Sequence, residues 1–156
     1  MGINILWNSG EIRDLSQLGK VLRQKQITEF LANKVFKTLS YVGESFVKKA
    51  RGINTYKDQT GNLRSSIGYI ILHNGKTVTS NFKLSKKGTD KVTGKDAAEN
   101  YAKNVVAAKY PTGWVLIGVA GMEYSVDVES LKIDVITASS VESREQMQRL
   151  LQKLVK

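Results

Sequence analysis

The residues of this 156-residue sequence that could do chemistry are a lone histidine, a segment rich in glycine and lysine, and a row of carboxylates. Cysteine is absent, which excludes disulfides, thiolate zinc sites and cysteine nucleophiles. His73 has no carboxylate within four residues, whereas a metal or catalytic site needs three or four groups that converge. We therefore expect His73 to have no catalytic or metal-binding role, and we expect the protein to need no cofactor.

Residues 88–96 resemble a phosphate-binding loop only superficially. Five residues separate Gly88 from Gly94, whereas the phosphate loop has four residues between its glycines. Asp96 follows Lys95 at the position where a serine or threonine binds magnesium, and its negative charge would repel a phosphate. The segment therefore predicts no nucleotide site.

Three acidic residues, Glu123, Asp127 and Glu129, alternate along a strand-like stretch, so their side chains are expected to share one face. One interpretation is an enzyme in which Glu123 or Asp127 acts as a base. The interpretation that we favour is an exposed acidic edge, because carboxylates are seldom buried. Acidic and basic surfaces on one chain are complementary, and head-to-tail association through them can close into a ring. We therefore predict a protein that is not an enzyme, with these acids at a subunit interface.

The formal net charge of +10 belongs to the first two thirds of the chain. Residues 1–110 carry nineteen Lys or Arg against eight Asp or Glu, a net +11, whereas residues 111–156 carry five against six, a net −1. Such a field attracts phosphate backbones or an acidic partner, although a solvated lysine-rich face is the other interpretation. Aromatic and basic residues are not interleaved as in sequence-specific nucleic-acid readers, so any DNA contact is expected to be to the backbone.

Length and hydrophobic periodicity predict one α+β domain with a single core, residues 15–156, behind an N-terminal arm, residues 1–14. Apolar residues recur every three or four positions from Leu15 onward, which predicts a long helix over residues 15–51. Because that helix would be roughly 55 Å long, we expect either a break near residues 20–26 or exposure of one end.

An antiparallel sheet of about four strands is expected after a loop rich in turn formers at residues 51–65. The pair Asn74-Gly75 favours a type I′ hairpin, because both central residues of that turn need positive φ. The strand-like stretches are residues 66–73, 76–82, 114–120 and 122–128, with a shorter one at 132–136.

Two shorter helices complete the predicted domain. Asp96 and Glu99 have the spacing of a capping box, which predicts a middle helix that starts at Asp96 and ends before Pro111. Ser139 and Glu142 have the same spacing at the start of a C-terminal helix.

No apolar run approaches the eighteen residues of a membrane span, and the first residues lack a signal-peptide pattern. We therefore expect a soluble, cytosolic product with no membrane partner.

Residues 83–95, between the hairpin and the middle helix, are mainly Lys, Gly, Thr and Ser, which predicts a mobile loop. We call this segment the lysine loop. Its lysines are candidate contacts to a DNA backbone or to an acidic partner: Lys83, Lys86, Lys87, Lys91 and Lys95.

Residues 55–67, TYKDQTGNLRSSI, resemble a segment of the neck and tail-completion proteins of long-tailed bacteriophages. In that family a long helix ends, a Thr-Gly-x-Leu-Arg-x-Ser-Ile turn follows and a strand begins, and the same order is expected here. The match is tight over residues 60–67, and the order of elements is similar over about residues 20–155. Residues 119–129 also resemble a late strand of the family, although Ser130 stands where that strand usually ends in glycine.

The matched turn is a structural joint rather than an active site. Gly61 permits the reversal of the chain, while Leu63 and Ile67 can anchor the turn in the core. Arg64 can cap carbonyl groups or contact a neighbouring subunit. We use the name joint for the six positions Thr60, Gly61, Asn62, Leu63, Arg64 and Ile67.

The resemblance implies a structural virion protein of a phage or prophage that forms a homo-oligomeric ring at the head–tail or tail-end interface. Its implied partners are further copies of itself, other neck or tail proteins and, through its lysines, the backbone of the genome DNA. Its implied location is the virion and, during assembly, the host cytoplasm. The alternative is a small basic nucleic-acid-binding accessory protein, distinguished by tight DNA binding that weakens steeply with salt.

Overall fold

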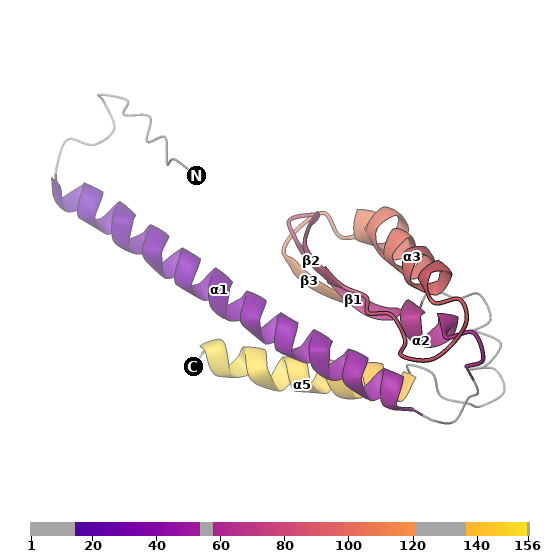
Figure 1. Ribbon diagram of the computed structural model, residues 1–156. Helices are drawn as coiled ribbons and strands as arrows, with labels where there is room; N and C mark the ends of the chain where they lie inside the picture. The colour runs from indigo at the N-terminus through magenta and orange to yellow at the C-terminus, as the bar shows by residue number, and fades with distance from the viewer. Residues whose placement is uncertain (1–14, 54–57, 121–136, 156) are drawn as a thin grey trace. The chain divides into compact units, whose positions relative to one another are not determined.

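The computed structural model describes residues 15–53, 58–120 and 137–155 (Figure 1). The predicted α+β class is confirmed, because a long N-terminal helix, an antiparallel sheet and a C-terminal helix are all present. The chain divides into two compact units, residues 1–34 and residues 35–156. Within the described ranges, no helix combines the length and the apolar character that a membrane crossing requires.

Helix α1, Leu15–Gly52, runs for 38 residues. Of the two expected alternatives, the structure has an exposed segment and not a break: in residues 19–34 every side chain except that of Ala32 is exposed. In the second unit the same helix buries one face, because its apolar residues keep helical spacing. The buried positions on that face are Leu39, Val42, Phe46, Val47 and Ala50.

The sheet has three described strands in the order β2-β1-β3, with both pairs antiparallel. They are β1, Ile67–His73, β2, Lys76–Asn81, and β3, Trp114–Ala120. The sequence predicts about four strands; three are described, and the remaining strand-like stretches, 122–128 and 132–136, lie outside the described residues. The hairpin prediction is confirmed, since Asn74 and Gly75 have φ values of 50° and 75°.

Strand β1 is the centre of the second unit, because both of its faces are covered. Tyr69 and Ile71 pack on the α1 side, in a cluster with Leu39 and Phe46. Ile70 and Leu72 pack on the opposite side, against the small residues of helix α3, Val92–Tyr101, and of the turns that follow it. Burial on both faces explains why β1 is a nearly continuous apolar run rather than an alternating one.

The middle helix starts earlier than predicted. Helix α3 begins at Val92 and not at Asp96, because its first turn receives acceptors from other residues. Asp90 Oδ1 accepts the Thr93 backbone N–H at 3.4 Å, and Asn62 Oδ1 accepts the Gly94 N–H at 2.9 Å. The helix continues through a π-helical turn, η1, Ala102–Val106, and a 3-10 turn, η2, Ala107–Lys109, and it stops before the proline as predicted.

Two other helix boundaries differ from the sequence prediction. The joint contains a short helix, α2, Asn62–Ser66, where only a turn was expected. Helix α5, Thr137–Val155, starts upstream of the predicted cap Ser139, so this serine lies inside the helix and is buried. Met147 of α5 packs against the α1-side cluster of the sheet.

Candidate interaction site: the joint and the lysine loop

The turn of the joint is held by a carboxylate that precedes it in sequence. Asp58 Oδ1 accepts the backbone N–H of Gly61 at 3.0 Å, and Asp58 Oδ2 accepts that of Arg64 at 2.9 Å. Gly61 has φ of 82°, in the left-handed region that glycine adopts without strain. Asp58 therefore fixes the start of α2 from three residues before the glycine, which is a local arrangement of the kind that aspartate favours in turns.

The joint is anchored in the core and bonded to the end of α1. Leu63 is 2% exposed and Ile67 is fully buried, so both side chains pack in the α1-side cluster. Arg64 Nη2 donates to the carbonyl of Ile53 at 3.3 Å, immediately after α1 ends. Thr60 accepts the Asn62 N–H with its hydroxyl at 3.3 Å. These contacts fix the path from helix to strand.

The backbone of the lysine loop is hydrogen-bonded to Thr60 of the joint and to Ser65, which lies between joint positions Arg64 and Ile67. The Asp90 N–H donates to the carbonyl of Thr60 at 3.1 Å, and the Ser85 N–H donates to the hydroxyl of Ser65 at 2.9 Å. Between these points Gly88 passes so close to Thr60 that an added Cβ would lie 2.1 Å from the Thr60 carbonyl oxygen. The two segments are therefore one packed substructure; the mobility of residues 83–95 stays a prediction.

Asn62 links the joint, the lysine loop and α3 with one amide group. Its Oδ1 caps α3 at Gly94, and its Nδ2 donates to Asp90 Oδ2 at 3.4 Å. Hydrogen bonds from Thr93 and then from Asn62 hold the pKa of the Asp90 carboxyl below its ordinary value. The folded state therefore favours the charged form of Asp90.

The Asp90→Asn variant is expected to lower the free energy of unfolding at neutral pH and to match the wild type in acid. Because folding lowers this pKa, the stabilisation is complete above the ordinary value of 3.8 and is lost as the pH falls through the lower, folded value. Urea unfolding across a pH series from neutral into strong acid measures it. The control Asp96→Asn removes an exposed carboxylate from the first turns of α3, and an equal loss there would contradict the role of the Asn62 network.

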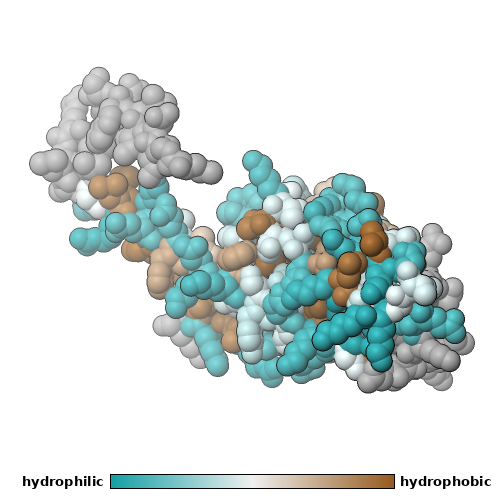
Figure 2. All heavy atoms as spheres, viewed as in Figure 1, coloured by the Kyte–Doolittle hydropathy of each residue, from teal (hydrophilic) through white to brown (hydrophobic). Residues whose placement is uncertain are grey.

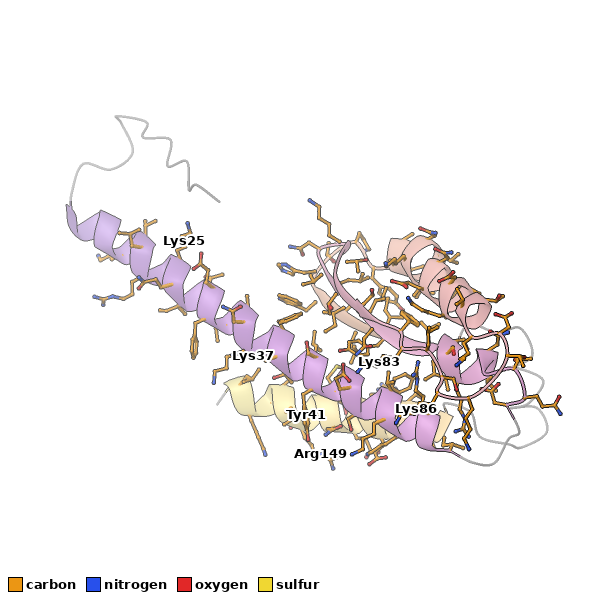
Figure 3. All side chains as sticks on the ribbon, viewed as in Figure 1. Lys25, Lys37, Tyr41, Lys83, Lys86 and Arg149 are labelled. Atoms are coloured by element: carbon orange, nitrogen blue, oxygen red, sulfur yellow. The ribbon has the colours of Figure 1, made fainter. Side chains whose placement is uncertain are left out.

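The lysines of the lysine loop differ in exposure. Lys83, Lys86 and Lys87 are exposed, whereas Lys91 and Lys95 are half-buried. Figure 3 labels Lys83 and Lys86 on the stretch that follows β2. The pKa of Glu99 is lowered chiefly by its hydrogen bond with Lys103 and further by the charges of Lys103 and Lys95. The first three lysines are therefore the more accessible to a partner, and of these Lys83 also forms an ion pair with Glu44 at 3.6 Å.

The other predicted site residues contribute no described chemistry. Glu123, Asp127 and Glu129 lie outside the described residues, as do residues 54–57 of the matched segment. In the part of the chain that the structure describes, no three His, Cys, Asp or Glu side chains are grouped as a metal site would need. His73 stacks on Trp114 with ring centroids 4.2 Å apart, which is a packing role.

Sequence reasoning missed two groups of residues at this site. Asp58 has a usable signal, because an aspartate three residues before a turn glycine is a common capping pattern. Glu44 and Arg51 on α1 have none, because their partners Lys83 and Asn81 are more than thirty residues away.

The chain was also compared with protein-family models, with curated proteins and with solved structures, and none of the three comparisons finds a match.

Proposed function

We propose that this chain is a non-enzymatic structural protein of a phage or prophage virion that assembles as a ring at the head–tail or tail-end interface. The proposal draws on the resemblance of residues 60–67 to neck and tail-completion proteins. It is supported by the order of α1, joint and β1, which is the order of helix, turn and strand in that family. The observation that carries it is an apolar surface on α1 that is exposed among the residues that the structure describes.

That surface lies within residues 19–34, in the first unit. Its large apolar side chains are between 45% and 59% exposed: Val21, Leu22, Ile27, Phe30 and Leu31. Figure 2 shows hydrophobic atoms standing among hydrophilic ones along this part of α1. A helix without tertiary partners is only marginally stable in water, and soluble monomers rarely expose large apolar patches. Further copies of the chain would cover these side chains in a ring.

Ile27, Phe30 and Leu31 form the core of the proposed contact. Their spacing of three and four residues places them on one side of the helix. Lys34 lies over the Phe30 ring, with its ammonium 5.3 Å from the ring centroid, so the patch has a basic rim. A large aromatic side chain with a charged neighbour is typical of residues that dominate an interface.

The double variant Phe30→Ser, Leu31→Ser is expected to shift the protein from oligomer to monomer. Each truncated anchor of an interface costs about 1–2 kcal/mol or more, so the dissociation constant should rise by about 30-fold or more. Sedimentation velocity across a concentration series measures it. The matched control Leu84→Ser, Val92→Ser changes two equally exposed apolar residues of the second unit and should leave the oligomer intact.

A wild-type protein that stays monomeric at high concentration and shows no salt-sensitive DNA binding would contradict the proposal. Both results are needed, because a ring component can wait for its partner ring before it assembles. A monomer that binds DNA tightly, with an affinity that falls steeply with salt, would instead favour the nucleic-acid-binding accessory protein. The exposure of Lys83, Lys86 and Lys87 is the observation on which that second candidate depends.

A further inference from the structure

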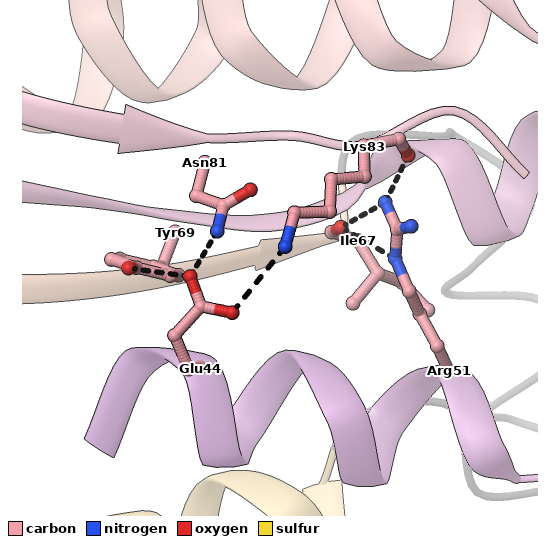
Figure 4. Close-up of polar contacts among 6 residues, drawn as sticks. All are labelled: Glu44, Arg51, Ile67, Tyr69, Asn81 and Lys83. Atoms are coloured by element: carbon pink, nitrogen blue, oxygen red, sulfur yellow. Dashed lines mark hydrogen bonds and ion pairs between the residues drawn. The ribbon is translucent and has the colours of Figure 1, made fainter. Parts of the chain in front are cut away.

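A polar network ties the second half of α1 to the end of β2 (Figure 4). Glu44 Oε1 accepts hydrogen bonds from the Tyr69 hydroxyl at 3.1 Å and from the Asn81 side-chain amide. The other oxygen, Glu44 Oε2, forms an ion pair with Lys83 at 3.6 Å. Burial and then the charge of Glu44 raise the pKa of Tyr69, so this tyrosine remains a neutral donor. Both carboxylate oxygens of Glu44 therefore already have partners within the chain.

Arg51 fixes the backbone of Lys83 against the same helix. Its Nε and Nη2 donate to the carbonyl of Ile67 at 3.2 Å and 2.9 Å, and Nη2 also donates to the carbonyl of Lys83. Both the side chain and the backbone of Lys83 are thus positioned from α1 (Figure 4). The lysine loop begins at a defined place on the α1 surface.

A hollow of about 510 Å³ lies beside this network. Its charged lining consists of three cationic side chains and one acidic side chain: Lys48, Arg51, Lys83 and Glu44. The Lys83 side chain is 65% exposed, and Lys48 is exposed with no ion pair to any carboxylate of the described residues. The hollow is therefore basic: Lys48 is open to a ligand, and Lys83 stays largely exposed although it forms an ion pair with Glu44.

Tyr41 adds an aromatic ring to the lining of the hollow. It lies on α1, where Figure 3 labels it, and it is 60% exposed. It precedes Lys48 by seven residues, about two helical turns, and both side chains line the hollow. An exposed aromatic ring beside lysines is the combination that proteins use to bind single-stranded nucleic acid, where the ring stacks on a base and the cations follow the phosphates.

We infer that this hollow binds the phosphodiester backbone of a nucleic acid, with Lys48 and Lys83 at the phosphates and Tyr41 against a base or sugar. The binding site extends from the lysine loop onto α1, where the sequence indicated no particular lysine. The inference rests on the proposed function only in the choice of duplex DNA as the first probe. Ring assembly itself does not require the hollow.

The test measures binding of the full chain to a short labelled duplex DNA, and to one of its strands alone, by fluorescence anisotropy across a salt series. The variant Lys48→Gln, Lys83→Gln is expected to weaken binding about tenfold at low salt and to reduce the slope of log affinity against log salt by about one per lysine. The control Lys76→Gln, Lys109→Gln removes the same charge from two exposed lysines outside the hollow and should change affinity by about twofold or less.

The Tyr41→Ala variant is expected to weaken binding of the single strand more than binding of the duplex, because only unpaired bases can stack on the ring. Tyr41→Phe keeps the ring and should restore the wild-type affinity. Circular dichroism verifies the fold of each variant; in the Lys83 variant Glu44 still has Tyr69 and Asn81 as partners.

Three results would overturn the inference. The wild type fails to bind either DNA at low salt; or the hollow pair and the control pair weaken binding equally; or polyglutamate binds as tightly as DNA with the same dependence on Lys48 and Lys83, which would assign the hollow to an acidic protein. Sedimentation velocity on the same samples measures the oligomeric state, so that ring assembly and nucleic-acid binding by the hollow are tested separately. A ring whose DNA affinity is insensitive to the hollow refutes this inference alone, whereas hollow-dependent binding by a protein that stays monomeric supports this inference and favours the nucleic-acid-binding accessory protein over the ring.

Discussion

Replacing Gly61 with alanine is expected to lower the free energy of unfolding of the second unit by about 2–5 kcal/mol. Two effects add. Alanine at φ of 82° is strained by about 1–2 kcal/mol, and its Cβ would lie 2.3 Å from the backbone carbonyl oxygen of Lys87. Because that oxygen belongs to the backbone of the packed lysine loop, it cannot rotate away, and relief requires the loop to move, at about 1–3 kcal/mol.

Gly113→Ala is the matched control for this prediction. Gly113 has φ of 75°, yet an added Cβ would meet nothing within 4 Å. The Gly113→Ala variant should therefore lose only the free energy of the backbone strain, about 1–2 kcal/mol. Urea unfolding followed by far-UV circular dichroism compares the two variants under the same conditions. Equal losses would show that the contact between the joint and the lysine loop adds nothing to stability.

Leu63→Ala is expected to lower the free energy of unfolding by about 2–5 kcal/mol. Leu63 is 2% exposed and packs in the cluster that contains Phe46 and Ile67, so its truncation removes apolar contacts and leaves a cavity in a close-packed core. The control Leu84→Ala makes the same chemical change in the lysine loop at a side chain that is 48% exposed. A difference of less than about 1 kcal/mol between the two variants would contradict an anchoring role for Leu63.

The features that could be predicted from the sequence are those in which the determining residues are neighbours along the chain. Asn74 and Gly75 take positive φ because their own side chains permit it, so the hairpin needs no distant contact. The α1 helix follows from apolar spacing, and the end of the middle helix follows from Pro111. The position of the joint between helix and strand likewise depends on Asp58 and Gly61, which are three residues apart.

The wrong boundary of the middle helix has a physical cause, which is a hydrogen-bond acceptor that arrives from elsewhere in the fold. The spacing of Asp96 and Glu99 is a good capping box, but Asp90 accepts the N–H of Thr93 and the distant Asn62 accepts that of Gly94, so the helix starts earlier. A buried N–H must find a partner, and the partner's distance along the sequence does not matter.

The charged surfaces likewise depend partly on local sequence and partly on contacts between distant segments. Composition and position along the chain are enough to place the positive charge in the first 110 residues and to single out the lysine loop. Whether a given lysine is open to a ligand depends on folding, which pairs Lys83 with Glu44 and brings Lys48 and Lys83 to the same hollow. Such pairings form between segments that meet only after α1 and the hairpin pack together, so no pattern of neighbouring residues could have indicated them.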